Sequence, residues 1–301
     1  MAWWQRWVRQ PQSVSFRRAV FQIHLWTGLL AGLYIVVLSL TGSVMVYRVE
    51  LVRFFATPRP QFDASALRRS TDELRAAAQR MYPDYVITYI SDAVTRRNPT
   101  VEIRLERRGE TKERLFNPYT GEDLGDSTTA GESFLLWVAS LHDELLLDRD
   151  GRFWNGAGSV LVTLLALTGS VIWWPGPGRW RRSLKPKWST SWPRFSWDLH
   201  SALGFWCLGF VALWGVSGIY LGIPEPFTSA NDYLFGPPPE FGETPGDVFL
   251  AWLARLHFGR WRNGPLQALW AVVGLVPAVL FATGSVMWWN RVVRRTLRKD
   301  A

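Results

Sequence analysis

Two stretches decide the fold of this chain: HLWTGLLAGLYIVVLSLTGSVMVY at residues 24–47 and HSALGFWCLGFVALWGVSGIYLG at residues 200–222. Neither contains Asp, Glu, Lys or Arg. The chain has four windows without these residues, at 20–47, 153–178, 199–224 and 263–290. Each window exceeds the ~20 residues that a helix needs to cross a hydrocarbon core of ~30 Å. The sequence therefore predicts an all-α membrane bundle with four transmembrane helices.

The charged residues are divided unequally among the segments between these windows. The net charge is +9, yet 23 of the 25 acidic residues lie in 48–152 and 225–262. The other segments are basic, and the positive-inside rule places both termini and the loop at 179–198 in the cytoplasm. We interpret the excess of basic residues as a signal for orientation and for contact with the lipid bilayer. It does not predict a nucleic-acid partner.

The two quoted stretches repeat each other. When their first residues are aligned, each copy has a histidine followed by glycines at matching positions: His24, Gly28 and Gly42 in the first copy, and His200, Gly204 and Gly218 in the second. Such self-similarity indicates repeated structural units.

A second pair of segments repeats in the same order. GESFLLWVASLH at 131–142 and GDVFLAWLARLH at 246–257 both end in leucine-histidine. TGSVIWW at 168–174 and TGSVMWW at 283–289 then follow after equal intervals. The sequence therefore predicts two tandem repeats of two transmembrane helices, each repeat with an outer amphipathic segment that ends in histidine.

The first repeat carries an insertion with the pattern of a small periplasmic α+β module. We expect a helix at 71–82, strands at 86–90, 100–106 and 113–116, and a turn at 117–121. The predicted order of segments is: cytoplasmic N-terminus 1–18, transmembrane helix 19–47, module 48–130, interfacial helix 131–150, transmembrane helix 154–175, basic cytoplasmic loop 176–196, transmembrane helix 197–222, periplasmic loop with an interfacial helix 223–262, transmembrane helix 264–290 and cytoplasmic tail 291–301.

The four histidines divide into two layers by depth. His24 and His200 each follow an arginine by six residues, which places them near the cytoplasmic side. His142 and His257 lie in the interfacial segments that re-enter the outer ends of the second and fourth transmembrane helices. Eighteen helical residues span ~27 Å, so the layers cannot share one metal. Each layer also contains two glycines: Gly169 and Gly284 in the inner layer, and Gly42 and Gly218 in the outer layer.

Two histidines that face each other across a bundle suit a haem with two axial imidazole ligands. We therefore predict two b-type haems, one ligated by His24 and His200 and the other by His142 and His257. Residues without side chains make room for a flat macrocycle, and the candidates are Gly28, Gly42, Gly169, Gly204, Gly218 and Gly284. Gly28 and Gly32 equally suit close helix packing, and His142 and His257 alone equally suit interfacial side chains. Zinc prefers four ligands and fits less well.

The propionate groups of such haems need cationic partners. Candidates are Arg17 and Arg18 on the inner side, and Arg152, Arg260 and Arg262 on the outer side.

These motifs resemble the PepSY-associated transmembrane family. The resemblance rests on FRRAVFQIHLWTGLLAG at 16–32, LTGS at 40–43, SLH at 140–142 and RLHFGR at 255–260. The insertion at about 64–126, with its NPYTGE at 117–122, resembles the PepSY domain of that family.

The resemblance implies a protein similar to bacterial inner-membrane ferric-siderophore reductases. Such a protein passes electrons through haem to a periplasmic ferric siderophore or another iron(III) chelate. The second outer loop is short for the family. The chain has no glycine-rich dinucleotide motif, so its electron donor is either quinol or a cytoplasmic reductase. Two alternatives stay open: a non-enzymatic membrane protein whose module binds a periplasmic partner, and a cytochrome b-like subunit that passes electrons to another protein.

Overall fold

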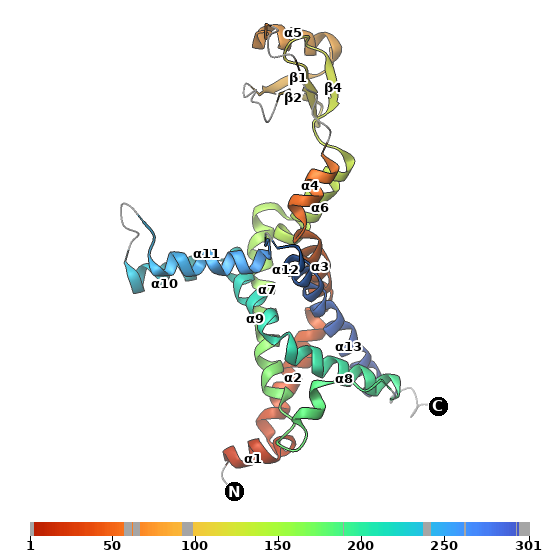
Figure 1. Cartoon of the computed structure of the whole chain (residues 1–301), viewed down its shortest axis with the longest axis vertical. Helices are drawn as coiled ribbons and strands as arrows, with labels where there is room; N and C mark the ends of the chain where they lie inside the picture. The colour runs from red at the N-terminus through yellow and green to blue at the C-terminus, as the bar shows by residue number, and fades with distance from the viewer. Residues whose placement is uncertain are drawn as a thin grey trace. The chain divides into compact units, whose positions relative to one another are not determined.

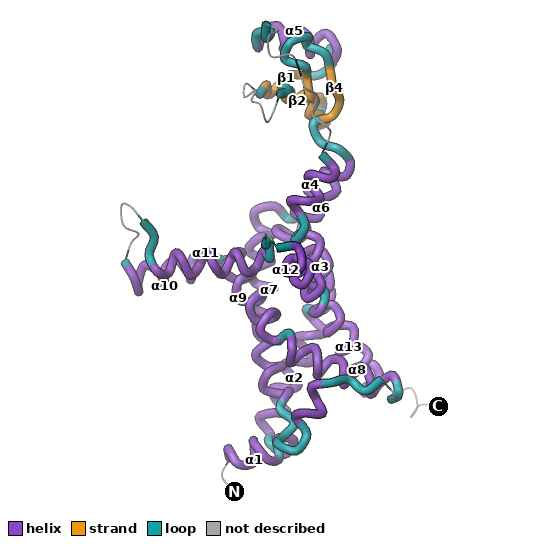
Figure 2. Tube along the Cα trace, in the orientation of Figure 1, coloured by secondary structure: helices purple, strands orange, loops and turns teal. Residues whose placement is uncertain are grey.

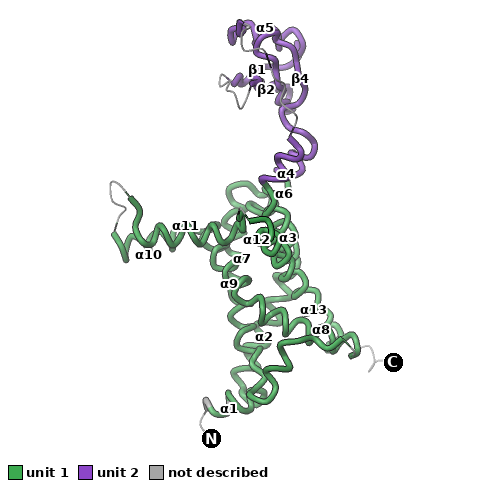
Figure 3. Tube along the Cα trace, viewed as in Figure 1, with its two compact units in different colours: residues 1–48, 137–301 green, residues 49–136 purple. Residues whose placement is uncertain are grey.

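The structure is a computed structural model that describes residues 3–56, 62, 67–91, 99–188, 190–236, 242–261, 263–292 and 294. The chain is mostly helical, with one small sheet (Figures 1 and 2). It forms two compact units: Met1–Arg48 together with Trp137–Ala301, and Val49–Leu136 (Figure 3). The mostly helical character, the apolar helices and the small antiparallel sheet confirm those parts of the prediction.

Two helices in the first unit are long and apolar enough to cross a membrane alone. One is α7, Asp148–Trp173. The other is continuous in direction over Gly264–Arg291 and consists of α12, Gly264–Gly274, and α13, Val276–Arg291. A helix of 26 residues extends ~39 Å, which is more than the hydrocarbon thickness of a bilayer.

The two stretches that carry His24 and His200 are bent helix pairs. The first pair is α2, Ser15–Leu30, and α3, Gly32–Met45, and the chain bends by 63° between them. The second is α8, Trp192–Trp206, and α9, Leu208–Gly222, and the chain bends by 64° between them. Each pair is apolar enough to form one broken span, so the structure contains two to four candidate spans.

Gly32 directly follows the first bend. A side chain at this position would overlap the ring of Phe281 in α13, so the missing side chain lets the ring approach the backbone. Kinks commonly occur at glycine or where a side chain enters the helix. The prediction of one straight helix over 19–47 could not include this contact, because Phe281 lies at the other end of the chain.

Each bent pair contacts both long helices (Figure 1). In the first pair, α2 packs against α7 and α3 packs against α12 and α13. In the second pair, α8 packs against α13 and α9 packs against α7. Polar side chains also join these helices: Ser39 Oγ donates to the Gly274 carbonyl at 2.5 Å, and Gln267 Nε2 donates to the Val46 carbonyl at 3.0 Å. Such bonds satisfy carbonyl groups at the ends of α3 and α12, where the regular helical hydrogen bonds stop.

The remaining helices lie at the ends of these spans. The two that carry outer histidines are α6, Ala130–Glu144, and α11, Pro245–Phe258. Thr244 starts α11 with a capping box that includes Asp247, and Gly259 ends it in a left-handed conformation at φ 58°. The others are α1, Trp3–Arg9; η1, Pro11–Ser13; α4, Arg48–Phe55; η2, Trp180–Leu184; and α10, Glu225–Phe235.

The second unit contains an antiparallel sheet in the order β1-β2-β3-β4 and the helix α5, Thr71–Met81. The strands are β1, Val86–Ile90; β2, Val101–Arg107; β3, Glu110–Phe116; and β4, Asp123–Asp126. Alternate residues of β2 (Val101, Ile103 and Leu105) are fully buried and pack with Leu74 and Phe116. This alternation is the period of two that places one face of a strand on a core.

A partly buried polar network joins this sheet to the end of α5. Tyr82 donates its hydroxyl proton to Asp123, and Arg114 donates to the same carboxylate at 2.9 Å. Burial alone would raise the pKa of Asp123, but these hydrogen bonds favour the carboxylate and hold its pKa below the usual value. The side chains that bind Asp123 therefore keep it charged.

The secondary structure of this unit differs in detail from the prediction. The helix and the first strand lie where expected, whereas β3 begins at Glu110 and not at residue 113, and β4 was not predicted. The added half of β3 is polar and pairs with β2 through register partners such as Glu106↔Thr111. β4 contains Gly125 and two aspartates, residue types that are uncommon in strands.

Candidate functional site

The inner pair of histidines comes from two bent helix pairs. His24 lies in α2 and His200 lies in α8. Their ring centroids are 6.3 Å apart and the ring planes are at 88°. The two imidazoles therefore face each other between segments that are far apart in the sequence.

The outer pair has nearly the same spacing. His142 lies near the end of α6 and His257 near the end of α11. Their ring centroids are 6.5 Å apart, at an angle of 56°. Burial lowers the pKa of His257 to about 3 and also lowers that of His142. Both outer rings are therefore neutral at neutral pH, which is the form that can ligate a metal.

A hydroxyl group holds the Nδ1 atom of every one of these rings. His24 Nδ1 lies 2.9 Å from Thr168 Oγ1, and His142 Nδ1 lies 2.9 Å from Thr41 Oγ1. In the second repeat the corresponding bonds are 3.0 Å for His200 with Thr283 and 2.7 Å for His257 with Ser217. Across the described part of the chain, no hydrogen bond joins the Nε2 atom of any of the four rings. Nε2 is the nitrogen left for a ligand.

The glycine that follows each hydroxyl residue makes room for an imidazole. A side chain at Gly42 would begin 2.9 Å from His142 Cε1, and one at Gly169 would begin 3.3 Å from His24 Cε1. At Gly284 the distance to His200 Cε1 is 3.4 Å. Gly218 differs, because a side chain there would first overlap Ser159. Three of these four glycines thus have a histidine ring as their nearest neighbour, where the sequence predicted the edge of a macrocycle.

Gly28 and Gly204 have a different environment. They follow the inner histidines by one helical turn and so share a helix face with them. A side chain would meet Leu165 at 3.6 Å and Leu280 at 4.0 Å, both ordinary contacts. Close helix packing therefore does not require a glycine at either position, in contrast to Gly32. Space remains on the helix face that carries each inner histidine.

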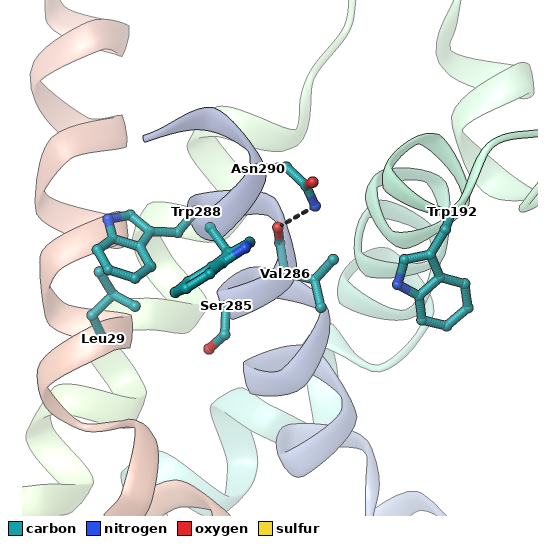
Figure 4. Close-up of a pocket in the computed structure, with 7 residues that line it drawn as sticks. Leu29, Trp192, Ser285, Val286, Trp288 and Asn290 are labelled. Carbon is teal, nitrogen blue, oxygen red and sulfur yellow. Dashed lines mark hydrogen bonds between the residues drawn. The ribbon is translucent and has the colours of Figure 1, made fainter. Parts of the chain in front are cut away.

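A pocket of about 490 Å³ lies in the first unit, and neither His24 nor His200 lines it (Figure 4). It lies between α2, α8 and α13, and Trp192, Trp288 and Leu29 line it. Ser285 also lines it and directly follows Gly284, which contacts His200. The Ser285 Oγ atom is buried and, within the described residues, has no hydrogen-bond partner. A mostly apolar cavity with a few polar groups is typical of cofactor sites.

A second pocket has a volume of about 540 Å³. It lies between α9 and α11, and its lining includes Leu213, Trp252 and Leu256. Leu256 directly precedes His257, but neither outer histidine lines this pocket.

The ring spacing fits a single metal between each pair. Imidazole–metal bonds are about 2.0 Å long, and a ring nitrogen lies about 1.2 Å from the centre of its ring. Two rings that share a metal therefore have centroids about 6.4 Å apart. In the part of the chain that is described, no three His, Cys, Asp or Glu side chains come together to hold a metal. A metal held by only two protein ligands suits haem, whose macrocycle supplies the other four ligands.

The predicted arginine partners have mixed environments. Arg17 donates to the Ile172 carbonyl and, at 2.6 Å, to Gln12, while its buried Nε has no partner among the described residues. Arg152 forms an ion pair with Glu144 at 2.7 Å. The guanidinium of Arg260 lies 4.8 Å from the centre of the Phe258 ring. Arg18 is exposed, and Arg262 lies outside the described residues.

The hydroxyl residues are the part of the site that was not assigned from sequence. Thr41, Thr168, Ser217 and Thr283 each precede one of the predicted glycines. A signal for them existed, because a hydroxyl residue followed by glycine recurs at all four duplicated places.

The chain matches the family described as the PepSY-associated TM region (PepSY_TM), over residues 21–245 and 237–291. Both histidine pairs, their hydroxyl partners and the glycines beside them lie within the matched residues. No match was found among curated proteins.

Proposed function

Since this chain belongs to the family of PepSY-associated TM regions, we propose that it is a di-haem b-type protein that carries electrons across a membrane. His24 and His200 ligate the inner haem, and His142 and His257 ligate the outer haem. The observation that carries this proposal is that all four histidines form two facing pairs, with centroids 6.3 and 6.5 Å apart. Haem held in this way supplies one-electron redox chemistry.

The protein's own residues hold, space and shield the two sites. The four histidines are ligands and the hydroxyl residues orient their rings. Gly42, Gly169 and Gly284 let the rings sit against a neighbouring helix. The bend in the first helix pair brings the sites closer. With a bend of 63° from a straight line, His24 and Gly42 lie about 23 Å apart, compared with the ~27 Å of a straight helix.

The proposed topology has four spans in two tandem repeats. When the sequence is aligned so that His24 matches His200, α2 aligns with α8 and α3 aligns with α9. The bend at Ala31 then aligns with the bend at Cys207. The shift that places His142 on His257 places α6 on α11, and α7 on the combined length of α12 and α13. Helix boundaries that coincide throughout support a duplicated fold.

The distribution of charge supports an inner-membrane location with both termini in the cytoplasm. The proposed segment boundaries remain those predicted from the sequence, with the module at 48–130 on the periplasmic side. Labelling of single cysteines in a Cys207→Ser background, at residues 185 and 232, tests this orientation. A membrane-impermeant thiol reagent applied from outside should label residue 232 alone, and labelling of residue 185 alone would reverse the topology.

The proposed reaction is the reduction of a periplasmic ferric siderophore or another iron(III) chelate. One electron converts iron(III) to iron(II), which hard oxygen ligands bind less tightly, so the iron is released. Quinol or a cytoplasmic reductase donates the electron. The similarity of the sequence motifs to those of inner-membrane ferric-siderophore reductases supports this choice of substrate.

A reduced-minus-oxidised visible spectrum of the purified protein tests the proposal. Two b-type haems per chain are expected, and dithionite-reduced protein should pass electrons to ferrioxamine. A spectrum without a haem band would contradict the proposal and favour a non-enzymatic membrane protein whose module binds a partner. Haem-loaded protein that reduces no ferric chelate would favour a cytochrome b-like subunit that serves another protein.

A further inference from the structure

Each hydroxyl that contacts a histidine makes a second hydrogen bond within its own helix. The partners are carbonyl groups four residues earlier. Thr41 Oγ1 donates to Val37 at 2.7 Å, and Thr168 Oγ1 donates to Leu164 at 2.7 Å. The corresponding distances in the second repeat are 2.5 Å from Ser217 to Leu213 and 2.8 Å from Thr283 to Val279.

These bonds decide the direction of the hydrogen bond to each histidine. A hydroxyl has one proton to donate, and a carbonyl oxygen can only accept. Once the proton points to the carbonyl, the hydroxyl oxygen can only accept from the imidazole. The histidine Nδ1 must therefore carry the proton, and the lone pair of a neutral ring then lies on Nε2.

His200 provides independent support for this assignment. Its Nδ1 lies 3.0 Å from the Leu280 carbonyl as well as 3.0 Å from Thr283 Oγ1. Because the carbonyl has no proton, this Nδ1 must be the donor whatever the direction of the Thr283 hydroxyl. The structure thus requires the Nδ1–H form at one ring, and the same arrangement of hydroxyl and backbone recurs at the other three.

We propose that Thr41, Thr168, Ser217 and Thr283 are positioning residues that lock their histidines in the Nδ1–H tautomer and present Nε2 to the centre of each pair. The tautomer follows from the hydrogen bonds alone. The role of Nε2 as a haem ligand rests on the proposed function. Hydrogen bonds to the outer nitrogen of a ligating histidine orient the ring and increase its basicity.

The four locks differ in redundancy. Among the described residues, His257 Nδ1 bonds to the Ser217 hydroxyl alone, whereas His200 Nδ1 bonds to both Thr283 and the Leu280 carbonyl. Removal of the Ser217 hydroxyl should therefore release His257 more fully than removal of the Thr283 hydroxyl releases His200.

Nitrogen-15 NMR of histidine-labelled, haem-free full-length protein measures the tautomer directly. All four rings should have a protonated Nδ1 and an unprotonated Nε2. Ser217→Ala should give a mixture of tautomers at His257, while Thr283→Val should leave His200 in the Nδ1–H form. Thr163→Val is the matched control, because the Thr163 hydroxyl makes the same bond to its own helix at 3.0 Å and has no histidine partner among the described residues. A protonated Nε2 in the wild type would overturn the proposal.

Measurements on haem-loaded protein provide a second test that does not depend on the haem-free fold. Ser217→Ala should weaken binding of the outer haem by about 10- to 100-fold and raise the reduction potential of the haem that remains, because a less basic ligand stabilises iron(III) less. Thr168→Val should have a smaller effect at the inner haem, because the Leu165 backbone also hydrogen-bonds to His24, and Thr168→Ser should restore wild-type behaviour. Equal affinity and potential in Ser217→Ala and the wild type would refute the lock. Absence of haem from the wild type would instead refute the proposed function and leave the tautomer assignment in place.

Discussion

His24 and His200 lie in different halves of the chain, yet their ring centroids are 6.3 Å apart and their planes almost perpendicular. Neither ring is placed by its own helix alone. His24 is held by Thr168 from α7, and His200 by Thr283 from α13. Each histidine is thus oriented within its own repeat, and the pair forms where the two repeats meet.

Replacement of single histidines should separate the two sites. His24→Ala should remove the inner haem and leave the outer, so that haem content falls from two per chain to about one. His142→Ala should remove the outer haem only. Pyridine haemochrome assays give the content, and redox titration identifies which haem remains. Loss of both haems from either variant would show that the sites are not independent.

A methyl group at Gly42 should disturb the outer site. It would begin 2.9 Å from His142 Cε1, so the ring must move away from the position that Thr41 holds. Overpacking of this kind costs ~1–3 kcal/mol. Gly42→Ala should therefore lower outer haem content, as measured by the same assay. Gly209→Ala is the control, since a side chain there meets nothing within 4 Å. Equal haem loss in both variants would point to a general effect on the helices.

Gly32 and Phe281 should be energetically coupled. Gly32→Ala places a side chain on the Phe281 ring and should destabilise the protein by ~1–3 kcal/mol. Under the repeat alignment, Gly32 matches Leu208 and Phe281 matches Ala166. The small residue and the large residue of the pair therefore exchange places between the repeats. Gly32→Ala combined with Phe281→Ala should therefore cost less than the sum of the two single changes. A double-mutant cycle from unfolding in detergent measures the coupling; additive costs would argue against a direct contact.

The outer site should lose stability in mild acid. In unfolded protein both outer histidines titrate near pH 6.5, whereas burial lowers the pKa of His257 to about 3 and also lowers that of His142. Between these values the unfolded state binds more protons, so stability is full above pH 6.5 and falls as the pH decreases towards 3. For His257 the loss approaches ~1.4 kcal/mol per pH unit.

Hydrogen exchange of amides in α6 and α11, between pH 7 and 5, measures this loss once the intrinsic pH dependence of exchange is removed. His257→Gln cannot titrate and should show a shallower dependence on pH than the wild type. The same slope in both proteins would mean that another group controls the acid response.

Much of the fold could be predicted from local patterns. The charge-free windows predicted apolar helices because a span needs length and an absence of charge, and both are visible in the sequence. The sequence predicted a strand at 100–106, which the structure confirms as β2, where Val101, Ile103 and Leu105 form one buried face. β4 escaped prediction because its glycine and aspartates have weak strand preference, and only pairing with β3 makes it a strand.

The sequence by itself determined which residues form the candidate site, because duplication placed all four histidines and their glycines at matching positions. It also indicated two layers, since distance along a helix measures depth. Only the tertiary structure decided the partners. The bends at Ala31 and Cys207, the hydroxyl beside each Nδ1 and the fit of Cε1 against Gly42 all depend on helices that are distant in the sequence. The physical reason is that a hydrogen bond or a close contact depends on where two segments meet, and no local pattern records that.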